Sequence, residues 1–157
     1  MSELGIELEL GDGVRRRFTD LVLDYTGTLS LDGVLLPGVA ERLAVLAKSI
    51  RVTVLTADTF GKAREQLAAL PVAVRIVATG TEKADLVREL GAAGVIAVGN
   101  GRNDVPMMTL AGLRLAVVGP EGAAGELLSL ADVVVTDVRH ALDLITHPLR
   151  LKATLRD

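Results

Sequence analysis

Length, composition and charge exclude several classes of protein. At 157 residues the chain has the size of one domain, so we expect residues 1–157 to fold as a single domain. A net charge of -3 gives no electrostatic reason to bind nucleic acid, and the absence of cysteine excludes a disulfide framework. No apolar run reaches the roughly 20 residues of a membrane span, and the N-terminus has no signal-peptide pattern. We therefore expect a cytoplasmic protein that binds neither nucleic acid nor a membrane and works alone or as a homo-oligomer.

The N-terminal segment predicts a β-hairpin. Apolar and acidic residues alternate over residues 6–10, and the turn Gly11-Asp12-Gly13 leads back toward a second strand over residues 18–23. The three arginines at positions 15–17 are expected on the solvated face of this hairpin. Amide side chains are scarce, a pattern typical of thermophilic proteins, because the chain has only Gln66, Asn100 and Asn103.

Beyond this hairpin the chain alternates between strands and helices. Asp32-Gly33 lies between apolar residues, as in a two-stranded flap, and Pro37 then begins a helix that runs to about Lys48. Further strands are predicted at 52–55, 72–77, 95–98, 113–118 and 133–135. Helices are predicted at 62–70, 82–90, 105–111, 122–130 and 138–145. This order favours an α/β fold, a Rossmann-like doubly wound parallel sheet with helices on both faces.

Two short strings follow predicted strands and contain most of the polar chemistry. Asp24-Tyr25-Thr26-Gly27-Thr28 comes directly after one apolar run, and Gly99-Asn100-Gly101-Arg102-Asn103-Asp104 comes after another. Open parallel sheets bind their ligands at the carboxyl ends of the strands. A carboxylate can attack phosphorus, and a second cluster of hard oxygens can hold Mg²⁺. Phosphoryl chemistry is therefore the first hypothesis.

Each of these residues, taken alone, also has a plain structural interpretation. Asp24 could cap a turn, and Thr56, at the end of the second predicted strand of the sheet, could begin one as readily as bind a phosphate oxygen. Lys83 is more informative, because it falls in the first turn of a helix capped by Thr79 or Thr81. The helix dipole disfavours a cation there by roughly 0.3–1 kcal/mol.

Other polar residues favour structural roles. Asp104 could cap the helix that begins near Pro106. Asp58 is expected to orient its loop or to cap a helix starting near Phe60. His140 and His147 have no partners at metal-ligand spacing, and no Walker-type phosphate loop is present.

Order and spacing together change this assessment. The Asp-x-Thr-Gly-Thr string, then Thr56, then Lys83 at a helix start, then the loop ending in Asp104 resemble the four motifs of the haloacid dehalogenase-like (HAD) superfamily. Within it the chain most resembles the phosphorylation domain of P-type ATPases, whose motifs are Asp-Lys-Thr-Gly-Thr, Thr-Gly-Asp and Gly-Asp-Gly-x-Asn-Asp. The tail over 147–156 is similar to soluble P-type ATPase-like proteins.

The resemblance implies a role for each matching residue. Asp24 would be the nucleophile that becomes an aspartyl phosphate, and Thr56 and Lys83 would hold phosphoryl oxygens. Four positions would bind Mg²⁺, through the side chains of Asp24, Asn100 and Asp104 and the carbonyl of Thr26. The transferring group and substrate would contact the backbone N–H groups of Tyr25 and Thr26, together with Ala57 and Asn103.

Two positions depart from the family pattern. Thr26 stands where phosphatases of this superfamily have a second Asp that protonates the leaving group and activates water. Losing such a group typically slows catalysis by about 10²–10⁴-fold. Asn100 stands where the family usually has Asp, so we expect weaker Mg²⁺ binding but not its loss. In P-type ATPases a Thr at the position of Thr26 accompanies a long-lived phosphoenzyme.

The chain also leaves no room for the cap domains that this superfamily inserts between its motifs. The segments from Asp24 to Thr56 and from Thr56 to Lys83 contain only the flap, two helices and one strand. An open site suits a large substrate such as a phosphoprotein, or a roof from a neighbouring subunit. The resemblance thus implies a slow Mg²⁺-dependent phosphatase for a phosphorylated substrate, small or macromolecular. The alternatives are a weakly active phosphorylatable module that regulates a partner, and a structural subunit.

Overall fold

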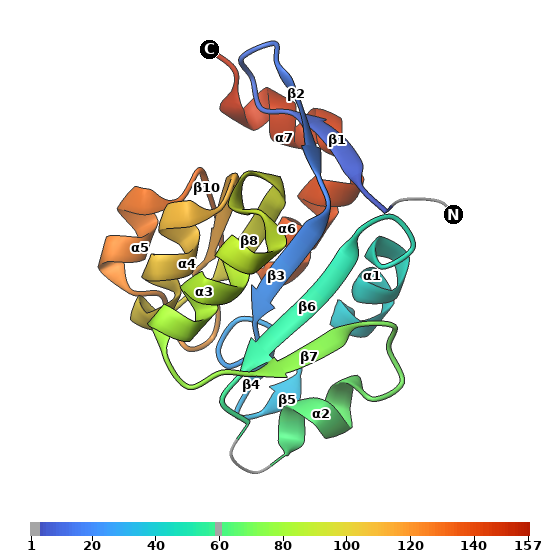
Figure 1. Cartoon of the computed structure of the whole chain (residues 1–157), viewed down its shortest axis with the longest axis vertical. Helices are drawn as coiled ribbons and strands as arrows, with labels where there is room; N and C mark the ends of the chain where they lie inside the picture. Colours follow the sequence, from blue (N-terminus) through green and yellow to red (C-terminus); the bar gives the residue numbers. More distant parts are fainter. Residues whose placement is uncertain (1–3, 59–60) are drawn as a thin grey trace.

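Six parallel strands form the central sheet of the protein (Figure 1). The computed structural model describes residues 4–58 and 61–157. In spatial order the strands are β10 (Val133–Val135), β9 (Leu113–Val117), β8 (Val95–Gly99), β3 (Asp20–Asp24), β6 (Arg51–Thr56) and β7 (Ala73–Ile76). The chain builds outward from β3 through β6 to β7, then returns to the other side of β3 and continues from β8 to β10. The strand order therefore reverses between β3 and β8, where an open sheet leaves a crevice at the carboxyl ends of its strands.

Helices cover both faces of this sheet, as predicted. On β3, Leu21 and Leu23 pack toward one face and Val22 toward the other, because successive side chains of a strand alternate. The first face is covered by α1 (Val39–Leu46), α2 (Lys62–Leu67) and α6 (Val138–Thr146). The second face is covered by α3 (Gly80–Leu90), α4 (Val105–Leu110) and α5 (Gly125–Leu130). The doubly wound α/β fold is confirmed.

The N-terminal hairpin stands beyond the end of the sheet. β1 (Ile6–Glu9) and β2 (Arg15–Phe18) pair antiparallel, and α7 (Pro148–Leu155), a helix that the sequence analysis did not identify, runs beside them (Figure 1). Gly11 has φ +93°, and a Cβ there would lie 2.5 Å from the backbone carbon of Leu155. A glycine at this turn thus permits the close packing of helix and hairpin.

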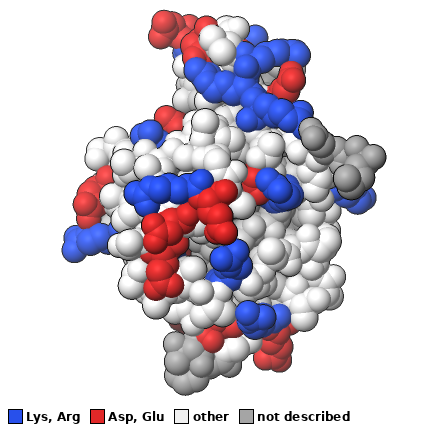
Figure 2. All heavy atoms as spheres, viewed as in Figure 1, with Lys and Arg blue, Asp and Glu red and all other residues white. Residues whose placement is uncertain are grey.

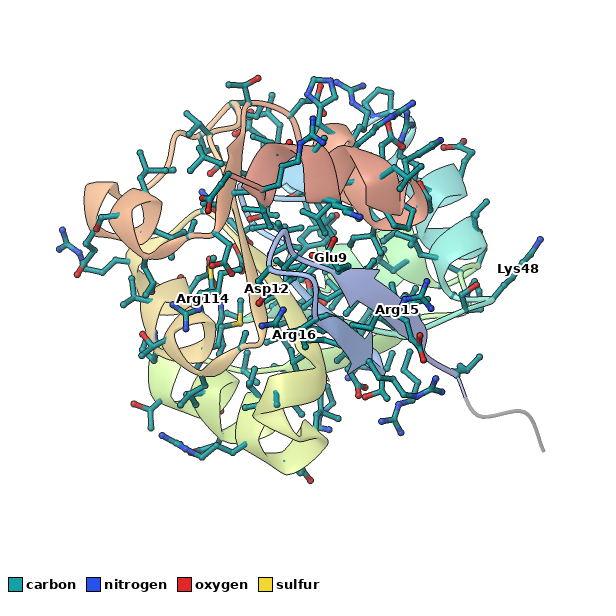
Figure 3. The ribbon with its side chains drawn as sticks, turned by 90° about the horizontal axis from the view of Figure 1, so that it is seen from above. Glu9, Asp12, Arg15, Arg16, Lys48 and Arg114 are labelled. Carbon is teal, nitrogen blue, oxygen red and sulfur yellow. The ribbon has the colours of Figure 1, made fainter. Side chains whose placement is uncertain are left out.

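Charged side chains surround this hairpin. Lys and Arg atoms gather at the protruding end of the molecule (Figure 2), and Arg16 lies beside Asp12 at the hairpin turn (Figure 3). Arg15 and Arg17 are exposed and Arg16 is half-buried, so the prediction of a solvated arginine face is confirmed for Arg15 and Arg17. Acidic partners from the hairpin itself offset this positive charge.

The second strand of the hairpin is shorter than predicted. β2 ends at Phe18, the N–H of Thr19 donates to the carbonyl of Gly94 at 2.9 Å, and β3 begins at Asp20. The prediction of one strand over residues 18–23 is therefore wrong, because this segment contains the end of one strand and most of another. A pattern of strand-forming residues does not show where the chain leaves one pairing partner for the next.

A small flap and a few turns complete the fold. β4 (Ser30–Leu31) and β5 (Val34–Leu35) pair antiparallel, and Asp32 and Gly33 between them have φ of 52° and 84°, as a tight hairpin turn requires. Two 3₁₀ turns, η1 (Ala92–Gly94) and η2 (Arg102–Asp104), precede β8 and α4. In the described residues only this flap and α1 lie between β3 and β6, and only α2 and β7 lie between β6 and α3. This order agrees with the prediction that no cap domain is inserted between Asp24 and Thr56 or between Thr56 and Lys83 in the described residues.

Candidate active site

A buried lysine joins two buried aspartates at the crevice between β3 and β8. Lys83 Nζ lies 2.9 Å from Asp24 Oδ1 and 2.8 Å from Asp104 Oδ1. The three residues are 3%, 6% and 0% exposed, respectively. Removing such charges from water is costly unless they are paired. Here the two carboxylates pair with the ammonium, and the ammonium offsets the repulsion between them. The sequence analysis predicted all three residues as site residues, and the structure brings them together.

Helix α3 places Lys83 at this point because of where it begins. The hydroxyl of Thr79 accepts the N–H of Glu82 at 3.2 Å, which identifies Thr79, and not Thr81, as the cap. Lys83 therefore lies in the first helical turn, facing the strand ends. The two carboxylates offset the unfavourable helix dipole at this position.

Backbone N–H groups of the loop after β8 hold the carboxylate of Asp104. Asp104 Oδ2 accepts the N–H groups of Asn100 and Gly101, each at 3.0 Å, while Oδ1 faces Lys83. Any side chain at Gly99 would collide with the carboxylate of Asp104. Asp104 is the N-cap residue of α4, as predicted, but its side chain makes no capping hydrogen bond to that helix.

A residue that the sequence analysis left without a role, Thr28, also belongs to this cluster. Its hydroxyl lies 3.3 Å from Asp24 Oδ2 and 3.0 Å from Asn100 Oδ1, and the residue is 1% exposed. A hydroxyl carries one proton, so it donates to one of these oxygens at a time. The signal was present, because Thr28 ends the same five-residue string as Asp24.

Burial and like charge shape the electrostatics of this cluster. Burial raises the pKa of Asp24 to about 7, with a further increase from the Asp104 carboxylate, against the opposite effects of Lys83 and Thr28. Burial alone would lower the pKa of Lys83, but Asp24 and Asp104 raise it, so Lys83 stays charged. Two carboxylates and one ammonium thus leave an excess of negative charge in a poorly solvated site, which favours a cation.

Thr56, the second of the four predicted motifs, borders a cleft of about 380 Å³. Its lining comes from the β3 loop, the flap, the β6 loop, α2 and the loop after β9, namely Tyr25, Thr26, Asp32, Gly33, Thr56, Ala57, Asp58, Lys62 and Glu121. Thr56 Oγ1 accepts the N–H of Asp58 at 3.0 Å. Three predicted site residues besides Thr56, namely Tyr25, Thr26 and Ala57, therefore border the same space.

Asp58 has the structural role that we predicted. Its carboxylate accepts the N–H groups of Ala63 and Arg64, at 2.7 and 3.2 Å, and so holds the start of α2. The helix was expected near Phe60, which lies outside the described residues; α2 itself begins at Lys62.

Two expected substrate contacts are not in place. The N–H of Tyr25 donates to the carbonyl of Leu55 at 3.0 Å, so it is not available to a phosphoryl group, contrary to our expectation. The Tyr25 side chain instead donates its hydroxyl proton to the carbonyl of Gly33 at 2.8 Å and so fixes the flap. Asn103 is exposed on η2 and does not border the cleft.

The donor set at the cluster fits Mg²⁺. Within residues 4–58 and 61–157, no three His, Cys, Asp or Glu side chains converge, so a cation at the crevice would have two carboxylates, Asp24 and Asp104. Mg²⁺ commonly takes one or two carboxylates from a protein and completes its octahedron with water and phosphate oxygens. Among the described residues, Asp24 Oδ2 has a single hydrogen-bond partner, Thr28 at 3.3 Å, and retains lone pairs for a cation.

Comparison with known proteins identifies relatives of the chain and of its fold. No protein family model matches the chain. The uncharacterized protein MJ0073 of Methanocaldococcus jannaschii is 46% identical over 63 residues, which cover 40% of this chain and 68% of that protein. No helix in the described part of the chain combines the length and the apolar composition needed to cross a bilayer.

Solved structures share the fold at low identity. A candidate HAD family hydrolase of Streptomyces avermitilis matches with a TM-score of 0.68 and 21% identity, over 92% of this chain and 91% of that one. The cobalt-bound YrbI phosphatase of Haemophilus influenzae matches with a TM-score of 0.69 and 19% identity, over 87% and 86%. The 3-deoxy-D-manno-octulosonate 8-phosphate phosphatase of Moraxella catarrhalis, solved with magnesium and phosphate ions, matches with a TM-score of 0.69 and 17% identity, over 88% and 89%. The likeness to P-type ATPases stays a prediction. The chain thus belongs to the family of the M. jannaschii protein and has the fold of the HAD hydrolases.

Proposed function

We propose that this protein is a Mg²⁺-dependent phosphohydrolase that acts through an aspartyl phosphate on Asp24. The observation that carries this proposal is the buried cluster in which Lys83 lies between Asp24 and Asp104 at the point where the strand order reverses. A structural ion pair needs one carboxylate, whereas a second one at 0% exposure destabilises an empty site. Perturbed, paired titratable groups in such a crevice are typical of active sites.

Each residue of the site has a separate role in the proposed phosphoryl transfer. The Asp24 carboxylate attacks phosphorus; Lys83 holds its Oδ1, while Oδ2 has one long contact, with Thr28. Lys83 neutralises charge on the transferring group, and the hydroxyl of Thr56 supplies a hydrogen bond to it. Asp24, Asn100, Asp104 and the Thr26 carbonyl would hold Mg²⁺, which when bound neutralises phosphoryl oxygens.

Thr26 makes hydrolysis the slow half of the reaction. It is exposed at the cleft, and a threonine hydroxyl does not accept a proton at neutral pH as a carboxylate does. We therefore expect the aspartyl phosphate to accumulate during turnover. The HAD-fold neighbours include phosphatases of a sugar phosphate, which supports a phosphorylated small molecule whose leaving group occupies the 380 Å³ cleft.

Ligand binding and turnover test this function together. Beryllium fluoride with Mg²⁺ mimics the aspartyl phosphate, so it should raise the melting temperature of the wild-type protein and leave Asp24→Asn unchanged. A panel of phosphorylated metabolites and phosphopeptides should then show release of inorganic phosphate that chelation of Mg²⁺ abolishes. Stabilisation without any turnover would favour the regulatory module, and no stabilisation at all would refute the phosphohydrolase.

A further inference from the structure

The cleft bordered by Tyr25 and Thr26, the two residues that follow Asp24, is lined by carboxylates from other segments of the chain. In the described chain its lining includes three acidic residues, Asp32, Asp58 and Glu121. Asp58 is committed to the backbone of α2 through both of its oxygens. Asp32 lies on the flap turn, and Glu121 lies in the loop between β9 and α5.

The loop of Glu121 is fixed to both halves of the active site. Gly122 closes a turn by donating its N–H to the carbonyl of Gly119 at 2.9 Å, with Glu121 inside this turn. Asn100 contacts the same turn, because its Nδ2 donates to the carbonyl of Gly122 at 3.1 Å. A second bond, from the N–H of Ala124 to the carbonyl of Asn100 at 2.8 Å, continues this contact. The turn is therefore held by the loop that contains Asp104.

The other side of this turn meets the loop of the nucleophile. A Cβ built on Gly119 would lie 3.4 Å from the carbonyl oxygen of Gly27, so the two backbones are in contact. Gly27 directly follows Thr26, which borders the same cleft as Glu121. The side chain of Glu121 is exposed, so the cleft is open to water on this side.

We propose that Glu121 is the general base of the second half-reaction, the role left vacant at Thr26; this inference rests on the proposed function. A water molecule in the cleft attacks phosphorus, its proton passes to the Glu121 carboxylate, and the bond between phosphorus and the Asp24 oxygen breaks. The products are inorganic phosphate and the Asp24 carboxylate, and Glu121 then releases its proton to solvent. Glu121 takes no part in the first half-reaction, in which Asp24 displaces the leaving group.

Rapid-quench kinetics with p-nitrophenyl phosphate and Mg²⁺ separates the two half-reactions. In Glu121→Gln the burst of one equivalent of p-nitrophenol should keep its rate, while steady turnover falls about 100-fold and acid-stable protein phosphate persists. Glu121→Asp should recover part of the steady rate. Glu41→Gln, on an exposed glutamate of α1 that does not line the cleft, is the matched control and should change neither phase. Because Glu121 and Glu41 are exposed, these variants should keep the wild-type melting temperature.

The outcomes distinguish this inference from the proposed function. If the wild-type protein forms a phosphoenzyme and Glu121→Gln turns over at the wild-type rate, Glu121 is not the base, and the phosphohydrolase stands. A slower burst in Glu121→Gln would show a role in substrate binding, and an equal loss in Glu41→Gln would show an effect that is not specific to Glu121; either result would overturn the inference. If the wild-type protein never becomes phosphorylated, the proposed function itself fails.

Discussion

The two ends of strand β3 carry the same chemical groups in opposite arrangements. Asp20 at the amino end and Asp24 at the carboxyl end are both buried and both paired with a cation. Asp20 Oδ2 accepts from Arg51 at 2.8 Å and from the Thr19 hydroxyl at 2.7 Å, and the Arg51 side chain is 59% exposed. Asp24 instead shares a cation that is 4% exposed with a second carboxylate.

This difference separates a structural ion pair from a site. At the amino end one acid meets one base, and the base keeps most of its hydration. At the carboxyl end two acids share one desolvated base, an arrangement that a structural ion pair does not need and that supports the proposed site. Substitutions at Asp20 and Asp24 therefore serve as controls for each other.

The largest expected effect is on turnover. Asp24→Asn removes the attacking oxygen and should lower phosphatase activity by at least about 1,000-fold. Asp20→Asn lies at the far end of the same strand and should keep the wild-type rate, while it loses about 1–3 kcal/mol of unfolding free energy because its partners lose a charge-assisted bond. Activity and urea unfolding of both variants check this contrast, and residual activity of a tenth in pure Asp24→Asn would remove Asp24 as nucleophile.

The second largest effect should be a difference in stability loss between substitutions of the two cations, Lys83 and Arg51. Lys83→Ala leaves Asp24 and Asp104 facing each other without a buried partner, so we expect a loss of about 3–5 kcal/mol in metal-free protein at pH 8. Arg51→Ala removes a largely solvated charge and should cost about 1 kcal/mol. Urea unfolding measures both. Equal losses would mean that the two ends of β3 are energetically alike.

A smaller effect should appear with pH. Because burial raises the pKa of Asp24 to about 7 from 3.8, the folded protein binds a proton more tightly than the unfolded chain. This preference favours the folded state below pH 4, and it is lost as the pH rises from about 4 to about 7. Metal-free protein should thus lose about 2–4 kcal/mol over this range in excess of Asp24→Asn. Parallel stability curves for the two proteins would contradict the charge excess.

The smallest effect should come from Thr26. Thr26→Asp restores a carboxylate at the position that the superfamily uses as acid and base, and turnover of an alkyl phosphate should rise about tenfold. An aryl phosphate with a good leaving group should gain less, because its leaving oxygen needs no proton and only the hydrolysis of the aspartyl phosphate can become faster. Steady-state rates on the two esters measure this difference. No gain on either, with Mg²⁺ binding preserved, would show that Thr26 does not limit the rate.

The sequence predicts the sheet and the flap because their signals are local, whereas the central cluster is predicted only from the order of four motifs and their resemblance to a superfamily. Strand and helix periods, an Asp-Gly turn and a strand end at Asp24 can each be recognised within a few residues. Contacts between distant segments cannot be recognised in this way, because they depend on which strands and helices become neighbours. Examples are the hydrogen bond from the Tyr25 N–H to the Leu55 carbonyl and the packing of α7 against the hairpin. The position of Glu121 follows from the same neighbours, because its turn is held by Asn100 and Gly27.

The most direct test of the account is to locate the phosphoryl group. Protein quenched in acid during turnover of p-nitrophenyl phosphate with Mg²⁺ can be digested and its phosphopeptide sequenced by mass spectrometry. We predict one phosphate per chain, on Asp24, present in Asp20→Asn and absent in Asp24→Asn. Phosphate on another residue, or turnover with no phosphorylated protein at any time after mixing, would contradict the account.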